Sequence, residues 1–194
     1  PRGVIVTRNM VIIGITGTLG AGKGTVVEHL VREKGFAHYS VREFLTNELE
    51  RRGTPVTRDA LSSLGDELRL HYSPSYIIEQ LYRKAEETGQ NAVIESIHNL
   101  GEVEFLRSKG ALLFAVDADQ RVRYERIKLR GSVTDAVSFE KFLADEGREM
   151  SATELHKQNI AACIALADYT IHNDATQDDL YVQMGQALKS VDVS

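Results

Sequence analysis

The residues with the clearest capacity for chemistry form a glycine-rich run around one lysine. The run reads GTLGAGKGT at residues 17–25 and matches the pattern G-x-x-x-x-G-K. Glycines let consecutive backbone N–H groups turn inward and form an anion-binding nest, and a helix beginning near Lys23 would add free N–H groups, its positive dipole end and the ammonium charge. The run therefore predicts a site for nucleotide phosphates, with contacts from Gly17, Leu19, Gly20, Ala21, Gly22, Lys23, Gly24 and Thr25.

The residue after Lys23 departs from the common form of this pattern. Most such loops place Ser or Thr there as a magnesium ligand, whereas this chain has Gly24 and carries Thr25 one position later. We therefore expect Mg²⁺ to be held by the phosphates of the ligand, water and a carboxylate, with Thr25 acting indirectly. Glu95 is the candidate carboxylate because it ends a buried apolar run, and open α/β sheets bind ligands at the carboxyl ends of strands.

The elements that must position these residues alternate between short apolar runs and longer helical patterns. Strands are predicted at residues 11–15, 36–39, 92–94, 111–116 and 169–171. Helices are predicted from about residue 23 and over 41–52, 57–70, 74–87, 102–109, 119–129, 152–166 and 176–189, with a polar segment up to about 148. Uniformly apolar strands separated by helices indicate parallel pairing with both faces covered, so we expect an α/β fold with a three-layer, doubly wound, five-stranded parallel sheet.

Length and composition limit the other possibilities. The chain has 194 residues with 42% hydrophobic and 26% charged residues, which indicates one globular domain over 10–194, with residues 1–9 as an N-terminal extension. A net charge of −5 argues against nucleic acid as a partner. The single Cys163 fits a buried, inert thiol. Without a long apolar run or a signal-peptide pattern, we expect no membrane partner and a cytoplasmic location, and the oligomeric state stays open.

The loop variant G-x-x-G-x-G-K-G-T resembles the phosphate loop of adenylate kinases and their relatives, with Leu19 where those enzymes commonly have Pro. Segments at residues 40–45, 64–69, 99–106 and 167–173 resemble, in their order, P-loop kinases described as dephospho-CoA kinase-like or as predicted nucleotide kinases. This resemblance spans roughly residues 10–190. It implies a core that binds ATP, a helical acceptor-binding segment at about 40–90, and a small arginine-bearing lid at about 130–150.

Phosphoryl transfer depends on alignment and charge neutralisation, so cations are the residues to find. Arg42, just after the second predicted strand, is expected to bind the acceptor phosphate, because a guanidinium can do so through two hydrogen bonds. Arg69 is a second candidate and Arg58 a weaker third, the alternative for each being a solvated helix face. The resemblance implies that Arg126 and Arg130, which share a helix face, contact ATP or the transferring phosphoryl group.

Two positions depart from the family pattern. Glu95 and His98 stand where these kinases more often have Asp and, three residues on, Arg, so His98 would offer the acceptor a cation that is half charged near pH 6.5. Asn173 resembles a position that borders adenine, although a turn-forming Asn-Asp pair explains it equally well. The predicted catalytic set is thus Lys23, Glu95, Arg126 and Arg130, with Arg42, Arg69 and His98 on the acceptor.

Three functions follow in order of preference. The first is an ATP-dependent phosphotransferase that moves the γ-phosphoryl group to a small phosphorylated acceptor, a nucleoside or deoxynucleoside monophosphate above all. The second is dephospho-CoA kinase, which would be expected to have Asp shortly after the second strand, where Glu43 is the only nearby acid. The third, motivated by Glu95 and His98, is a nucleotide-binding ATPase or regulator without small-molecule kinase activity.

Overall fold

A sheet of five parallel strands forms the centre of the computed structural model, which describes residues 10–131, 137–154 and 156–190. The strands are β1 (Ile12–Gly17), β2 (Ala37–Ser40), β3 (Ala92–Glu95), β4 (Leu112–Asp117) and β5 (Tyr169–His172). They lie in the order β2-β3-β1-β4-β5, and every neighbouring pair is parallel. The predicted α/β fold with a doubly wound parallel sheet is confirmed.

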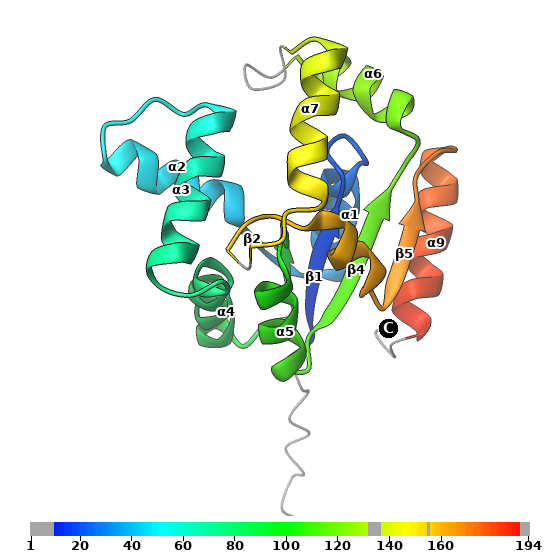
Figure 1. Cartoon of the computed structure of the whole chain (residues 1–194). Coiled ribbons are helices and arrows are strands. Elements are labelled where there is room, and N and C mark those ends of the chain that lie inside the picture. The colour runs from blue at the N-terminus through cyan, green and yellow to red at the C-terminus, as the bar shows by residue number, and fades with distance from the viewer. Residues whose placement is uncertain (1–9, 132–136, 155, 191–194) are drawn as a thin grey trace, which may run out of the picture.

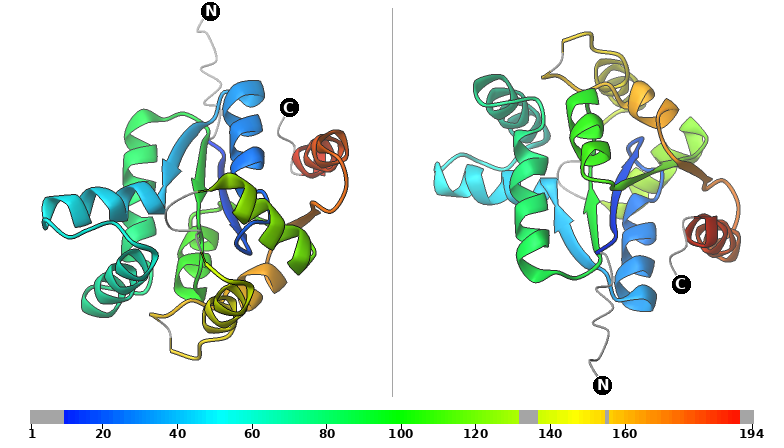
Figure 2. Two further views of the ribbon diagram at one scale, coloured as in Figure 1. Left: turned by 90° about the horizontal axis from the view of Figure 1, so that it is seen from above. Right: turned by 90° about the horizontal axis from the view of Figure 1, so that it is seen from below.

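Helices cover both faces of this sheet (Figures 1 and 2). One face carries α1 (Lys23–Lys34) and α9 (Gln177–Ser190), and the other carries α4 (Tyr76–Thr88), α5 (Leu100–Ser108) and α8 (Ile160–Ala165). Successive strand residues enter opposite cores: Ile12 packs in the core with α4 and α5, and Ile13 in the core with α1 and α9. Burial on both faces is the reason the strands are apolar without alternation.

The segment predicted to bind the acceptor, at about 40–90, contains α4 and the two helices that directly follow β2. They are α2 (Val41–Arg51) and α3 (Arg58–His71), and Figure 1 shows them projecting to one side of the sheet. The Ser40 hydroxyl accepts the Glu43 N–H at 3.2 Å and so caps α2, which fixes the direction in which this helix leaves the strand. The predicted bounds of both helices are confirmed to within about one residue at each end.

The structure corrects two predictions in the C-terminal half. After α6 (Gln120–Arg130), the segment predicted as polar and irregular contains α7 (Phe139–Met150), capped by Ser138 and anchored by the fully buried Phe142. The predicted helix 152–166 is helical only at Ile160–Ala165, because Asn159 caps α8 and donates its N–H to the His98 carbonyl at 2.7 Å. Residues 132–136 of the predicted lid and the extension at 1–9 lie outside the described residues.

Two further expectations concern Cys163 and the membrane. Cys163 is fully buried, and loss of hydration raises the pKa of its thiol to about 12, so it is inert as predicted. Within the described ranges, no helix has both the length and the apolar character needed to cross a bilayer.

Candidate active site

The phosphate loop connects the end of β1 at Gly17 to the start of α1 at Lys23. Gly22 caps α1 in the left-handed region, with φ at 99°, and a Cβ atom there would lie 2.2 Å from Asn173 Nδ2. Glycine is therefore required on both conformational and steric grounds. Asn173 approaches this closely because its Nδ2 donates to the Ala21 carbonyl at 2.8 Å, a contact that holds the loop from outside.

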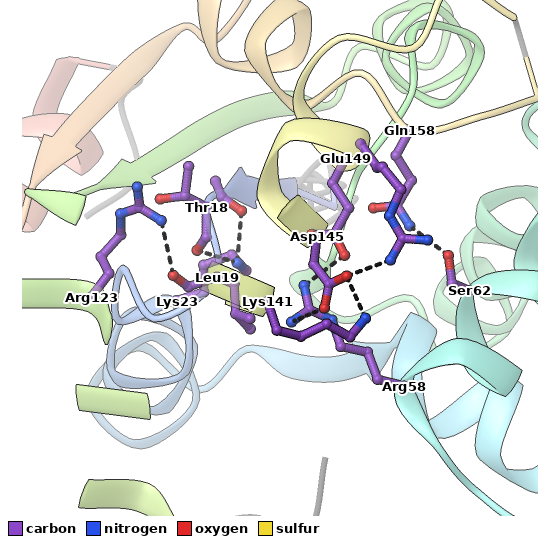
Figure 3. Close-up of polar contacts among 12 residues, drawn as sticks. Thr18, Leu19, Lys23, Arg58, Ser62, Arg123, Lys141, Asp145, Glu149 and Gln158 are labelled. Carbon is purple, nitrogen blue, oxygen red and sulfur yellow. Dashed lines mark hydrogen bonds and ion pairs between the residues drawn. The ribbon is translucent and has the colours of Figure 1, made fainter. Parts of the chain in front are cut away.

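Two further side chains fix the loop from the neighbouring strand and helix. Thr18 Oγ1 donates to Asp117 Oδ1 of β4 at 2.8 Å. Arg123 Nη1 of α6 donates to the Leu19 carbonyl at 3.2 Å (Figure 3). Arg123 Nε also donates to the Ala118 carbonyl at 2.8 Å, so the guanidinium connects the loop to the end of β4. The loop is thus held in shape by its surroundings before any ligand arrives.

Lys23 supplies the charge at this loop. Its Nζ donates to the Gly17 and Thr18 carbonyls at 2.7 and 2.8 Å. Removal of the ammonium from water lowers the pKa of Lys23 to about 8. The charges of Glu95 and Glu149 offset part of this effect, and Arg130 and Arg123 add a smaller repulsion. An anion placed beside Lys23 would therefore relieve an unfavourable charge as well as form hydrogen bonds.

A single cavity of about 710 Å³ extends from the phosphate loop to α2 and α3. Its wall carries six cationic side chains and three carboxylates, a local excess of three positive charges in a chain whose net charge is −5. The cations are Lys23, Arg42, Arg58, Arg69, Arg126 and Arg130, and the carboxylates are Glu28, Glu95 and Glu149. This excess fits a ligand that carries several negative charges at each end of the cavity.

Comparison with known proteins agrees with this geometry. A family model described as an AAA domain matches residues 13–154, which include the phosphate loop and most of the cavity wall. The chain belongs to this AAA domain family. The chain is also similar in sequence to two UPF0200 proteins. PAE1629 from Pyrobaculum aerophilum has 29% identity over 91% of this chain and 96% of that protein, and MJ1399 from Methanocaldococcus jannaschii has 27% identity over 94% of this chain and 91% of that protein.

Solved structures show the same fold at low sequence identity. TT1252 from Thermus thermophilus has 22% identity and a TM-score of 0.59, with 95% of this chain and 99% of that chain covered. Shikimate kinase from Aquifex aeolicus has 15% identity and a TM-score of 0.60, with the same coverage. The AAA domain therefore has a P-loop kinase-like fold, and the predicted resemblance to P-loop kinases is confirmed.

Most of the predicted phosphate-binding residues of this AAA domain line the cavity. They are Gly17, Leu19, Gly20, Gly22, Lys23, Gly24 and Thr25. Ala21 does not, because it is fully buried and donates its N–H to the Thr18 carbonyl at 3.3 Å. Arg42, Arg126 and Arg130 line the cavity as expected, and Arg126 Nη1 is buried without a hydrogen-bond partner among the described residues. A buried guanidinium nitrogen in that state favours an anionic ligand.

Glu95 lies at the carboxyl end of β3, on the cavity wall. Burial alone would raise its pKa, but hydrogen bonds from His38 and Ser40 and the charge of Lys23 hold the pKa of this carboxyl below its usual range. His38 Nε2 lies 3.2 Å from Glu95 Oε1. The described part of the chain has no cluster of three His, Cys, Asp or Glu for a metal. One ionised carboxylate and the Thr25 hydroxyl fit Mg²⁺ that is bound mainly by phosphates and water.

Arg69 forms a buried ion pair with Glu102. Its Nε and Nη2 both lie 2.9 Å from Glu102 Oε1, and the two side chains are 2% and 0% exposed. Glu102 Oε2 also accepts the backbone N–H groups of His98 and Asn99 at 2.7 and 3.2 Å. Although Arg69 borders the cavity, its charge is already paired, and the ion pair holds the turn between β3 and α5. The ion pair gives Arg69 a structural role, and its predicted contact with the acceptor stays a prediction.

The structure also adds to the predictions for the charge of His98 and the contacts of Asn173. Burial, together with the charges of Lys23, Arg69 and Arg58, lowers the pKa of His98 well below its ordinary value, so this cavity histidine is neutral rather than half charged near pH 6.5. Asn173 is buried, does not line this cavity and holds the phosphate loop through Ala21, and its predicted place beside adenine stays a prediction.

The polar segment predicted up to about residue 148 contains a helix, α7, that supplies part of the cavity wall. Arg58 Nη2 lies 2.7 Å from Glu149 Oε1, and its Nη1 lies 3.6 Å from the buried Asp145 (Figure 3). On the same helix, Glu146 lies 2.6 Å from Arg123, the residue that holds the phosphate loop. Helix α7 thus connects the acceptor helix α3 to the loop, and it was missed because its polar residues conceal the buried Phe142.

Proposed function

We propose that this protein is an ATP-dependent phosphotransferase that moves the γ-phosphoryl group of ATP, with Mg²⁺, to a small phosphorylated acceptor, preferably a nucleoside or deoxynucleoside monophosphate. One observation carries the proposal. A single positively charged cavity has the phosphate loop at one end and Arg42 and Arg58, on α2 and α3, at the other. Two phosphate-bearing ligands can therefore meet inside one cavity, which is what phosphoryl transfer requires.

The side chains divide naturally into donor and acceptor groups. Lys23 would move from the Gly17 and Thr18 carbonyls to the β- and γ-phosphates, and Arg126 and Arg130 would neutralise charge on the transferring group. Magnesium, when bound, would offset charge on the same phosphates, with Glu95 and Thr25 as the residues that would hold it and its water.

On the acceptor side, Arg42 and Arg58 would bind the phosphate of the acceptor. Helix α7, which falls within the expected lid, reaches α3 through Glu149 and the loop through Arg123. We infer that this helix helps to exclude water while the two ligands are aligned.

A hydroxyl acceptor, as in dephospho-CoA kinases, is the second candidate. Glu95 supports it because this ionised carboxylate lies on the cavity wall and could take the proton of a hydroxyl group. The two arginines at the acceptor end, Arg42 and Arg58, favour a phosphate acceptor over a hydroxyl acceptor.

The deciding experiment incubates the purified protein with ATP, Mg²⁺ and separate acceptors: nucleoside and deoxynucleoside monophosphates, and dephospho-CoA. We expect diphosphates to form, Arg42→Ala to raise the KM of the acceptor far more than that of ATP, and the exposed control Arg32→Ala to change neither. Formation of CoA alone would establish the second candidate. ATP hydrolysis or binding without any transfer would contradict both and indicate an ATPase or regulator.

A further inference from the structure

Gln158 lies on the cavity wall in the segment between α7 and α8, and its backbone is fixed on both sides. Its carbonyl accepts the Ala152 N–H at 3.3 Å. The next residue, Asn159, donates its N–H to the His98 carbonyl at 2.7 Å and caps α8 by accepting the Ala162 N–H at 3.1 Å. These hydrogen bonds hold Gln158 and Asn159 against the start of α8 and the turn after β3.

Only one of the two polar atoms of this side-chain amide has a hydrogen-bond partner among the described residues. Its Nε2 lies 3.4 Å from Ser62 Oγ on α3, which is a long hydrogen bond (Figure 3). Its Oε1 is buried and has no hydrogen-bond partner among the residues that the structure describes. A buried carbonyl oxygen without a donor is unfavourable, and a ligand N–H placed in the cavity would relieve this cost.

The surroundings of Gln158 suit a partly apolar ligand. Four apolar side chains line the same cavity. They are Ile160 at the start of α8, Leu61 on α3, and Val41 and Leu45 on α2. Small-molecule sites commonly combine such apolar walls with a few polar groups that form hydrogen bonds to the ligand and determine its orientation.

Arg58, one of the cations on the cavity wall, lies on the same helix as Ser62. Arg58 precedes Ser62 by four residues on α3, a rise of about 6 Å along the helix. Arg58 and Ser62 both line the cavity, so the phosphate and the ring of one ligand can contact the same helix. A ligand whose phosphate reaches Arg58 can therefore present a ring edge to the amide that contacts Ser62.

We propose that Gln158 is a specificity-determining residue of the acceptor site, whose Oε1 accepts a hydrogen bond from a ring N–H or amino group of a nucleobase. This inference rests on the proposed function and narrows its acceptor to a nucleotide, as opposed to a phosphorylated sugar without a base.

The test uses the full chain with its ATP site filled by a non-hydrolysable ATP analogue and Mg²⁺. Titration calorimetry then compares AMP, GMP, CMP and UMP with ribose 5-phosphate, which carries the phosphate but no base. We expect at least one nucleotide to bind about tenfold more tightly than ribose 5-phosphate, the size of one well-made hydrogen bond. Gln158→Met, which keeps the length of the side chain, should remove this preference and leave ribose 5-phosphate binding unchanged. The exposed control Gln90→Met should change neither.

The outcomes separate this inference from the proposed function. Equal binding of nucleotides and ribose 5-phosphate by the parent protein would overturn the base-reading role and leave phosphoryl transfer to a phosphorylated acceptor intact. Failure to bind any phosphorylated acceptor, with the ATP analogue still bound, would refute the acceptor proposal itself. A preference that survives Gln158→Met would also overturn the inference. If that variant does not fold, Gln158→Glu, which keeps an acceptor oxygen, must retain the preference.

Discussion

The protonation of Lys23 provides a quantitative test of the phosphate site. In the free protein its pKa is lowered from 10.5 to about 8, because the ammonium is largely removed from water. A triphosphate bound beside this ammonium would stabilise the charged form and raise the pKa of Lys23 back toward its ordinary range. ATP binding near pH 8 must then be accompanied by uptake of a proton from the buffer.

The magnitude follows from the two protonation states. At pH 8 the free lysine is about half protonated and the bound lysine almost fully protonated, so about 0.5 proton is taken up per ATP, against about 0.03 at pH 6.5. The same linkage predicts that the Kd for ATP weakens about tenfold between pH 7 and pH 9, because the free protein loses the charge that the phosphates require.

Titration calorimetry in two buffers with different ionisation enthalpies, such as HEPES and Tris, measures this uptake directly. Lys23→Arg is the matched control, since its guanidinium keeps the charge but does not titrate in this range. We expect the variant to show no uptake at pH 8. Zero uptake by the parent protein, or equal uptake by parent and variant, would refute the assignment of Lys23 to the phosphates. A Kd for ATP that is constant from pH 7 to pH 9 would refute it independently.

Three other perturbations test the surroundings of this site. Gly22→Ala should reduce ATP affinity at least tenfold because its Cβ atom would meet a side chain at 2.2 Å, whereas Gly185→Ala on α9, with nothing within 4 Å and outside the cavity wall, should bind ATP like the parent; equal affinities in a nucleotide titration would contradict this. Arg69→Ala leaves Glu102 buried without its partner and should lower the free energy of unfolding by about 3–5 kcal/mol in urea, and a loss near zero would show that the pair is not buried. Glu95, which lies beside His38, raises the pKa of that histidine. The pairing therefore stabilises the fold fully below the unfolded pKa of about 6.5, and this stabilisation is lost as the pH rises through the folded pKa. The parent should therefore lose stability between pH 6 and pH 8 relative to His38→Gln, and parallel profiles would count against the pairing.

The phosphate loop and the sheet could be predicted from the sequence because their determinants are contiguous. The spacing of glycines and Lys23 over residues 17–25 defines the turn, and an apolar run of a few residues defines each buried strand. The cavity positions of Arg42, Arg126 and Arg130 were also correct, since each follows from a short distance to the end of a strand or from one helix face.

Only the tertiary structure decided which of several chemically equal side chains form ion pairs within the protein, and with which partners. Arg69 and Arg58 are the same residue type in one helix, yet Arg69 meets the buried Glu102, which is 33 residues away, and Arg58 reaches Glu149, which is 91 residues away. The charge of His98 likewise depends on burial and on cations brought near it by folding. Local backbone geometry is encoded by neighbouring residues, whereas ion pairing and hydration depend on which distant segments pack together, and no short pattern records that.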